Sequence, residues 1–169
     1  MTLLQRITLP QAAALIAAAA LATVLSALGF QHLGGYLPCK LCYIERIAYY
    51  AGVPLAASAF FLARAGRSGL AVLLLGLCGL GFLINSGIGV YHSGIEWKWW
   101  PGPQTCSGAA LAPISGNLLE ALERARVVAC DEAPWRMFGL SFAGWNVLIS
   151  AGLALVALLG VRNSRSATP

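Results

Sequence analysis

The sequence predicts an all-α integral membrane protein, a four-helix bundle with one short and one longer outer loop. Its 169 residues are 59% hydrophobic and only 10% charged, with a mean hydropathy of +0.75, which is too apolar for the surface of a water-soluble domain. Four apolar stretches of about 20 residues would each reach about 30 Å as helices, the thickness of the hydrocarbon layer of a membrane. They lie at about 9–30, 43–63, 70–91 and 142–161. The remaining segments are too short for a second core, so we expect residues 1–169 to form one membrane domain.

The basic residues predict how the four spans are oriented. Cations without acidic neighbours occupy one side of the membrane: Arg6, Arg64, Arg67, Arg162 and Arg165. On the other side, the remaining basic residues are balanced by acidic ones. The positive-inside rule therefore places both termini in the cytoplasm, and the tryptophans near the outer span ends fit an interfacial aromatic belt. The net charge of +5 by itself gives no support for nucleic-acid binding.

The first span, at about 9–30, also resembles a secretory signal peptide. Arg6 precedes an apolar stretch that ends in the small residues Ser26, Ala27 and Gly29. The apolar core of a signal peptide usually runs about 7–15 residues, whereas this stretch continues for about twenty. We therefore expect a retained helix.

A short outer loop, residues 31–42, separates the first two spans. His32, Gly34, Gly35 and Pro38 interrupt the helical pattern there. The second span, at about 43–63, is followed by a tight polar turn at 64–69 on the inner side.

The third span, at about 70–91, leads into a long outer loop, residues 92–141. This loop begins with aromatic residues and a Pro-Gly-Pro at 101–103. Over about 115–128 its apolar residues, among them Leu118 and Leu122, oppose charged ones such as Glu120 and Arg124. That pattern predicts an amphipathic helix lying on the membrane surface. The fourth span, at about 142–161, follows the loop.

Cysteine placement points to chemistry on the outer side. Four of the five cysteines, Cys39, Cys42, Cys106 and Cys130, fall in the two outer loops, on the oxidising side of the membrane. An even set of four implies disulfides, and three pairings are possible. Cys78, in the middle of the third span, is interpreted as a small buried apolar residue with no role in redox chemistry.

Cys39 and Cys42 form a CxxC motif whose spacing suits chemistry better than stapling, because so short a loop constrains little chain. Cys42 lies where the second span begins, so free backbone N–H groups and the helix dipole would favour its thiolate. Arg46 follows one helical turn later and would present its guanidinium on the same face. The alternative for Arg46 is that it snorkels to the interface or pairs with Glu45.

Two structural alternatives exist for the outer cysteines. Together with His32 and His92 they could nominally bind zinc, but there is no second CxxC and no HxxxH, and disulfide formation competes in an oxidising compartment. We therefore expect no metal site. Cys106 and Cys130 could also form a purely structural disulfide across the long loop.

Together, these residues resemble the disulfide bond formation protein B (DsbB) family. The resemblance rests on Pro38-Cys39-x-x-Cys42-x-x-Glu45-Arg46, on four spans with two cysteines in the second outer loop, and on Cys130 followed by Trp135, the Phe-Gly-Leu at 138–140 and Trp145. It covers nearly the whole chain. The segment 89–106, GVYHSGIEWKWWPGPQTC, is similar to one branch of the family and differs from the enterobacterial form.

The resemblance implies a quinone-dependent thiol oxidase of the bacterial inner membrane that reoxidises a periplasmic thioredoxin-like partner, DsbA. It implies that the partner attacks the Cys106–Cys130 disulfide at Cys106, and that Cys130 then exchanges with Cys39. Cys42 would leave as a thiolate beside the ring of a quinone, ubiquinone or menaquinone. Arg46 would stabilise this thiolate and the developing quinone oxyanion. On this scheme Cys42 should have the lowest pKa of the four outer cysteines.

Four further polar residues receive roles at this stage. His92 is a weaker candidate for a hydrogen bond to quinone or for a proton donor, and its alternative role is that of a polar anchor at the interface. Glu45 is expected to orient Arg46. Asn85 and Asn146 are expected to join helices by hydrogen bonds rather than to contact quinone.

Three competing functions are weighed against this one. The nearest is a DsbI-like or vitamin K epoxide reductase-like thiol and quinone oxidoreductase with a different partner. A non-catalytic membrane scaffold stapled by disulfides comes from another class, and a metal-binding membrane protein is third. The sequence does not choose between the two quinones or between the possible resting pairings of the four cysteines.

Overall fold

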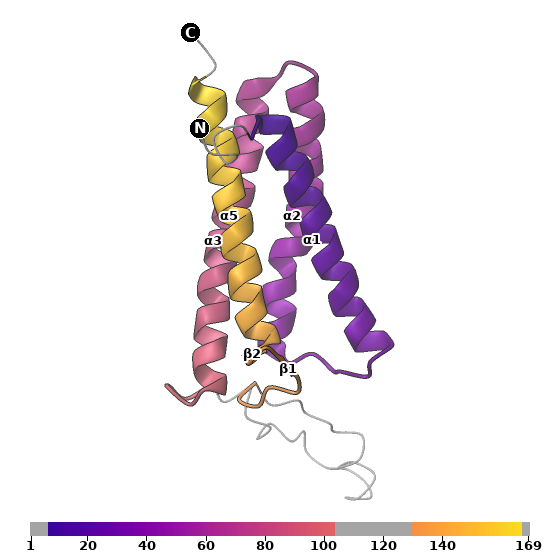
Figure 1. The fold of residues 1–169 in the computed structure, drawn as a ribbon, viewed down its shortest axis with the longest axis vertical. Coiled ribbons are helices and arrows are strands. Elements are labelled where there is room, and N and C mark those ends of the chain that lie inside the picture. The colour runs from indigo at the N-terminus through magenta and orange to yellow at the C-terminus, as the bar shows by residue number, and fades with distance from the viewer. Residues whose placement is uncertain (1–6, 104–129, 167–169) are drawn as a thin grey trace, which may run out of the picture.

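The structure is a computed structural model that describes residues 7–103 and 130–166. Within these ranges four long helices run side by side in alternating directions (Figure 1): α1 (Leu9–His32), α2 (Lys40–Arg64), α3 (Ser68–Glu96) and α5 (Phe142–Ser166). Each helix is long and apolar enough to cross a membrane. The predicted four-helix membrane bundle is confirmed in the described part of the chain. The amphipathic helix expected at about 115–128 lies outside the described residues, as do Arg6 and Cys106.

Local sequence signals set the helix ends. α1 begins after Thr8, whose backbone N–H donates to Gln11 Oε1 at 3.0 Å in a capping box. A tight turn joins α2 to α3, and Gly66 adopts φ +77° there, in the left-handed region that favours glycine. The Arg67 N–H donates to Leu62 O at 2.9 Å and so satisfies a carbonyl at the end of α2.

Two helices extend further than predicted at the end that carries the CxxC motif. α2 begins at Lys40 rather than at about 43, and α3 continues to Glu96 rather than ending near 91. Gly94 lets Trp100 pack on the last turn of α3, because a Cβ at that position would collide with the Trp100 ring. Trp100 instead folds back over the last turn of α3, where it stacks on Tyr91 and donates its Nε1–H to Tyr91 O at 2.9 Å. The segment 92–96, expected in the outer loop, is therefore helical.

The four helices pack through small residues. Seven alanines form much of the buried core: Ala12, Ala13, Ala20, Ala56, Ala59, Ala71 and Ala157. A Cβ on Gly160 of α5 would lie only 2.5 Å from the Cβ of Ala12 in α1, so these helices approach too closely for a larger side chain. Leucines such as Leu15, Leu73 and Leu158 point outward and are more than half exposed, as expected of a lipid-facing surface.

The two ends of the bundle differ in content. The start of α1, the end of α5 and the α2–α3 turn share one end, where Asn163 Nδ2 donates to Ile7 O at 3.0 Å (Figure 1). The opposite end holds the α1–α2 connection and a small hairpin of β1 (Arg136–Met137) and β2 (Leu140–Ser141). The hairpin turns through Phe138 and Gly139, which both have positive φ. The CxxC motif lies at this second end.

Candidate active site

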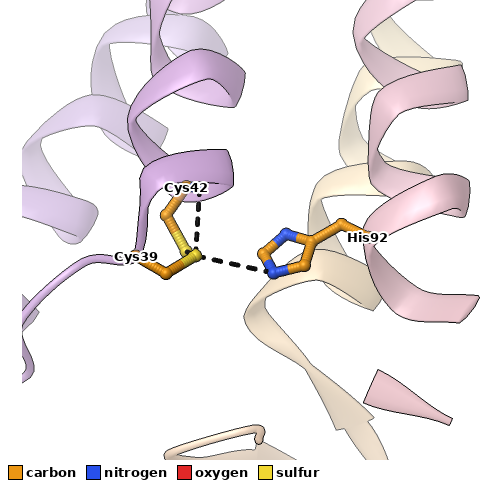
Figure 2. Close-up of side chains that lie close together, drawn as sticks. All are labelled: Cys39, Cys42 and His92. Atoms are coloured by element: carbon orange, nitrogen blue, oxygen red, sulfur yellow. Dashed lines mark hydrogen bonds between the residues drawn. The ribbon is translucent and has the colours of Figure 1, made fainter. Parts of the chain in front are cut away.

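The first turn of α2 places the two cysteines of the CxxC motif together. Cys39 is the N-cap of the helix, and its Sγ accepts the backbone N–H of Cys42 at 3.3 Å. The two Sγ atoms lie 2.9 Å apart (Figure 2), and both cysteines are free thiols. Because the free N–H groups and the positive end of the helix dipole are at this terminus, the fold favours a thiolate in this first turn.

A histidine and a glutamate complete a chain of three buried groups with Cys39. His92 Nε2 lies 3.6 Å from Cys39 Sγ, and His92 Nδ1 lies 2.8 Å from Glu45 Oε1 (Figure 2 shows the sulfur and imidazole contact). His92 and Glu45 are only 2% and 6% exposed. Glu45 therefore accepts the Nδ1–H and directs Nε2 at the sulfur, which is how a general base is held beside a nucleophile.

The chain of contacts explains which thiol is activated. The pKa of Cys39 is lowered to about 4, chiefly by the hydrogen bond from the Cys42 thiol. Burial opposes this shift, while the hydrogen bond and positive charge of His92 add to it. The expectation that Cys42 would have the lowest pKa is wrong for this dithiol form, because the stabilising groups converge on Cys39.

Arg46 is held by α1 rather than by Glu45. Its Nη1 donates to Gln31 Oε1 at 2.5 Å and its Nη2 to Ala27 O at 3.4 Å, and its guanidinium lies 5.7 Å from the centroid of the Tyr43 ring. The expectation that Glu45 orients Arg46 is wrong, since the Glu45 carboxylate is engaged by His92 on α3. Gln31, which no sequence pattern singles out, accepts the shorter of the two hydrogen bonds.

A cavity of about 400 Å³ opens beside the dithiol, between α1, α2 and α5. Cys39, Cys42, Arg46 and His92 line it, so the structure brings these four predicted site residues to one place. Most of its remaining lining is apolar or aromatic: Val24, Ala27, Phe30, Leu37, Trp135, Met137, Phe142, Trp145 and Ile149. The rings of Phe30 and Trp135 pack on Phe142 with centroids 5.1 and 4.9 Å away, and form an aromatic wall.

Beneath the cavity a polar cluster joins three helices. Tyr49 of α2 donates its hydroxyl to Asn146 Oδ1 of α5 at 2.7 Å, and Asn85 of α3 donates its Nδ2 to the same oxygen at 3.0 Å and to Ser150 Oγ at 2.9 Å. This confirms that Asn85 and Asn146 join helices. Asn146 and Tyr49 also line the cavity.

Two buried polar atoms at the cavity have no hydrogen-bond partner within the described residues: Asn146 Nδ2 and Glu96 Oε2. Glu96 lies one helical turn after His92 and is 9% exposed, and the Ser141 side chain hydrogen-bonds its carboxylate. Glu96 falls in the segment expected to be outer loop, so the sequence pattern did not single it out. The four-residue spacing from His92 would have singled it out if the helix had been expected to continue.

Of the other two predicted cysteines, Cys130 lies at the site and Cys106 lies outside the described residues. Cys130 is 1% exposed, disulfide-bonded, and packed in one buried cluster with Cys39, Leu41 and Ile95. The segment after it is anchored to the end of α3, where Lys98 Nζ contacts Asp131 Oδ2 at 2.7 Å and lowers the pKa of Asp131. Cys78 is buried on α3 with its Sγ 3.7 Å from Gly52 O.

Thiol–disulfide exchange at the edge of a membrane is the chemistry that this arrangement supports, which makes the chain a membrane thiol oxidoreductase. Comparison with known proteins gives the particular family. The model of the family described as "Disulfide bond formation protein DsbB" matches residues 10–160, and the chain belongs to that family.

Several curated proteins are similar to this chain. "Disulfide bond formation protein B" of Verminephrobacter eiseniae (strain EF01-2) is 29% identical over 168 residues, which cover 92% of this chain and 90% of that protein. "Disulfide bond formation protein B 2" of Pseudomonas syringae pv. syringae (strain B728a) is 30% identical over 139 residues, which cover 73% and 71%. No solved structure gives a significant match to the chain.

The geometry predicts that Cys39 reacts as a thiolate far below neutral pH. With the pKa of Cys39 lowered to about 4, the thiolate is present above that pH and is lost below it. His92→Gln removes the positive charge and should move the half-maximal reaction rate upward by about 1–3 pH units. The measurement is the rate of Cys39 alkylation by iodoacetamide, mapped by mass spectrometry. His32→Gln, at an exposed position, is the matched control. A wild-type half-maximum near the ordinary cysteine value of about 8.5 would contradict the assignment.

Proposed function

We propose that this chain oxidises the dithiol of a soluble thioredoxin-like partner of the DsbA type and passes the electron pair to a membrane quinone. The single observation that carries the proposal is the position of the Cys39–Cys42 dithiol, which lies between a buried disulfide cysteine, Cys130, and the wall of an apolar cavity. A thiol donor on the water side and an electron acceptor on the membrane side can therefore reach the same pair of sulfurs.

The proposed exchange begins at the second outer loop. The partner's thiolate attacks Cys106 of a Cys106–Cys130 disulfide, and the displaced Cys130 thiolate attacks Cys39 of the Cys39–Cys42 disulfide, which releases Cys42 as a thiolate. The partner's second thiol then forms the partner disulfide and frees Cys106, which attacks Cys130 and frees Cys39. The partner loses two electrons and two protons, and the Cys39–Cys42 pair gains them. The packing of Cys130 against Cys39 supports the second exchange.

The Glu45–His92 pair prepares Cys39 for the reoxidation of the Cys39–Cys42 dithiol to a disulfide. Only a thiolate attacks sulfur at a useful rate, so the pair that removes the Cys39 proton also makes the dithiol ready for oxidation. Because His92 is buried and bonded to Glu45, it can hold that proton as an imidazolium without an exposed charge.

A membrane quinone fits the cavity. The apolar and aromatic lining suits a ring and an isoprenoid tail, and a volume of about 400 Å³ falls in the range of small-molecule sites. Asn146 Nδ2, which has no hydrogen-bond partner in the described chain, would gain one from a ring oxygen. Asn146 would then contact the quinone as well as join helices, which differs from the expectation from the sequence. Cys42, Arg46 and His92 are the residues proposed to hold the ring. A bound quinone would supply the acceptor for two electrons and two protons.

The proposed location is the bacterial inner membrane, with the site end facing the periplasm. The charge bias supports this orientation, because Arg64 and Arg67 lie at the end opposite the dithiol and the positive-inside rule places such residues in the cytoplasm. Exchange with a soluble thiol oxidant then takes place in the oxidising compartment.

Anaerobic mixing tests the proposal directly. Detergent-purified chain, a water-soluble ubiquinone or menaquinone analogue and a reduced DsbA-type protein should together give quinone reduction, seen as a change in quinone absorbance. Cys42→Ser should abolish it, while Cys78→Ser, which removes a thiol buried away from the site, should not. Absence of reduction with both quinones and an intact partner would refute the function and favour a scaffold stapled by disulfides.

Arg46→Lys should weaken the site without destroying the fold. A lysine keeps the charge but cannot make two hydrogen bonds in a fixed fork, so one charge-assisted contact is lost, worth about 1.5–3 kcal/mol or about 10- to 100-fold in kcat/KM for quinone. Arg64→Lys, at the other end of the same helix, is the matched control and should leave kcat/KM unchanged. Equal kcat/KM values for the two variants would contradict the proposed role of Arg46 in holding the quinone.

A further inference from the structure

The dithiol site gathers three ligands that soft metal ions prefer. The Sγ atoms of Cys39 and Cys42 and a ring nitrogen of His92 all lie within 4.8 Å of one another, and no other such trio occurs in residues 7–103 and 130–166. Figure 2 shows that the three side chains converge from α2 and α3. Thiolate and imidazole together are the ligand set of protein zinc sites, which need tetrahedral geometry and borderline-soft donors.

The surroundings of His92 match those of a metal ligand. A histidine that binds zinc through one ring nitrogen almost always donates the other N–H to a carboxylate or carbonyl, which fixes the tautomer and the ring. Glu45 Oε1 accepts the Nδ1–H of His92 at 2.8 Å, so Nε2 faces the sulfurs and offers its lone pair to a metal ion that displaces its proton. The Cys39 sulfur is also held, by the backbone N–H of Cys42 at 3.3 Å.

One of the three distances already has the value that zinc requires, and all three ligand atoms lie within 4.8 Å of one another. With Zn–S of about 2.3 Å and Zn–N of about 2.0–2.1 Å, a tetrahedral ion separates sulfur from nitrogen by about 3.5 Å and sulfur from sulfur by about 3.8 Å. His92 Nε2 and Cys39 Sγ are already 3.6 Å apart. The two sulfurs, at 2.9 Å, must move apart by about 0.9 Å to reach the zinc value. Cys42 can supply this movement by rotation of its side chain, because it is half-buried at the cavity wall.

Against the expectation of no metal site, we propose that the dithiol form of this site binds one Zn²⁺ ion through Cys39 Sγ, Cys42 Sγ and His92 Nε2, and that the ion holds the chain in its reduced state. Binding releases two protons, that of the Cys42 thiol and the one that Cys39 and His92 Nε2 share, and transfers no electrons. Two thiolates neutralise the charge of the ion, so the buried complex carries little net charge. Sulfurs bound to zinc are not free to form the Cys39–Cys42 disulfide, so zinc blocks reoxidation, whereas the disulfide form offers no thiolates and does not bind. This inference rests on the ligand geometry alone and stands independently of the proposed quinone and partner.

The test uses Co²⁺ as a spectroscopic probe and Zn²⁺ as its competitor. The full chain carries Cys106→Ser and Cys130→Ser, so that Cys39 and Cys42 are the only thiols outside Cys78, and it is purified in detergent and kept anaerobic. The reduced chain should bind one Co²⁺ with thiolate-to-cobalt charge-transfer and tetrahedral d–d absorption, and zinc should displace it. The same chain oxidised to the Cys39–Cys42 disulfide should show neither band. Bands of equal strength in both redox states, or no bands in the reduced chain, would overturn the proposal.

Two variants separate a built site from a chance pair of thiols. Glu45→Gln keeps both thiols and His92 but weakens the support of the ring, and should lower zinc affinity by about 10- to 100-fold. Cys78→Ser should leave the zinc affinity unchanged, because the Cys78 thiol lies in the middle of α3, against Gly52 O of α2 and away from the site. Unchanged affinity in Glu45→Gln, with the cobalt bands intact in His92→Gln, would show that His92 is not a ligand and would overturn the three-ligand site.

Discussion

The hydrogen bond between Glu45 and His92 is the contact on which the site depends. A carboxylate and an imidazole buried among membrane helices are each costly alone, and each satisfies the other at 2.8 Å. Because Glu45 belongs to α2 and His92 to α3, the bond also ties together the two helices that carry the reactive groups. It turns Nε2 toward Cys39, and this orientation makes His92 able to take a thiol proton.

The cavity lies beside the same dithiol and is formed by helices that also position Arg46. Cys39 contacts both His92 and the buried cluster that holds Cys130, and together with Cys42 and Arg46 it also lines the apolar space between α1, α2 and α5. Arg46 is tied to α1 through Gln31, so the guanidinium and the dithiol are positioned by different helices. This division lets one end of the bundle exchange disulfides with a soluble protein while its interior offers electrons to a lipid-soluble acceptor.

Much of the fold could be predicted because membrane spans and the CxxC motif are local signals: hydropathy gave four helices, and spacing placed Cys42 and Arg46 on one turn. The errors came from contacts between distant segments. Glu45 and Arg46 are adjacent in sequence, so pairing between them was expected, yet the partner of Glu45 is on α3. The pattern ended the third span near residue 91, whereas α3 continues to Glu96 with Trp100 packed against Gly94, so neither His92 nor Glu96 was assigned to a helix. The thiolate was expected on Cys42 from the helix N-terminus and Arg46, and the contact of His92 with Cys39 from another helix was not visible in the sequence.

The most direct test of this account is the reduction potential of the Cys39–Cys42 pair, measured in glutathione redox buffers on a chain with Cys106→Ser and Cys130→Ser. If Glu45 and His92 stabilise the Cys39 thiolate, they stabilise the reduced pair and raise its potential. Glu45→Gln should then make the potential more negative, by about 30 mV for each tenfold loss of that stabilisation. An unchanged or more positive potential in Glu45→Gln would contradict the central role of the Glu45–His92 bond.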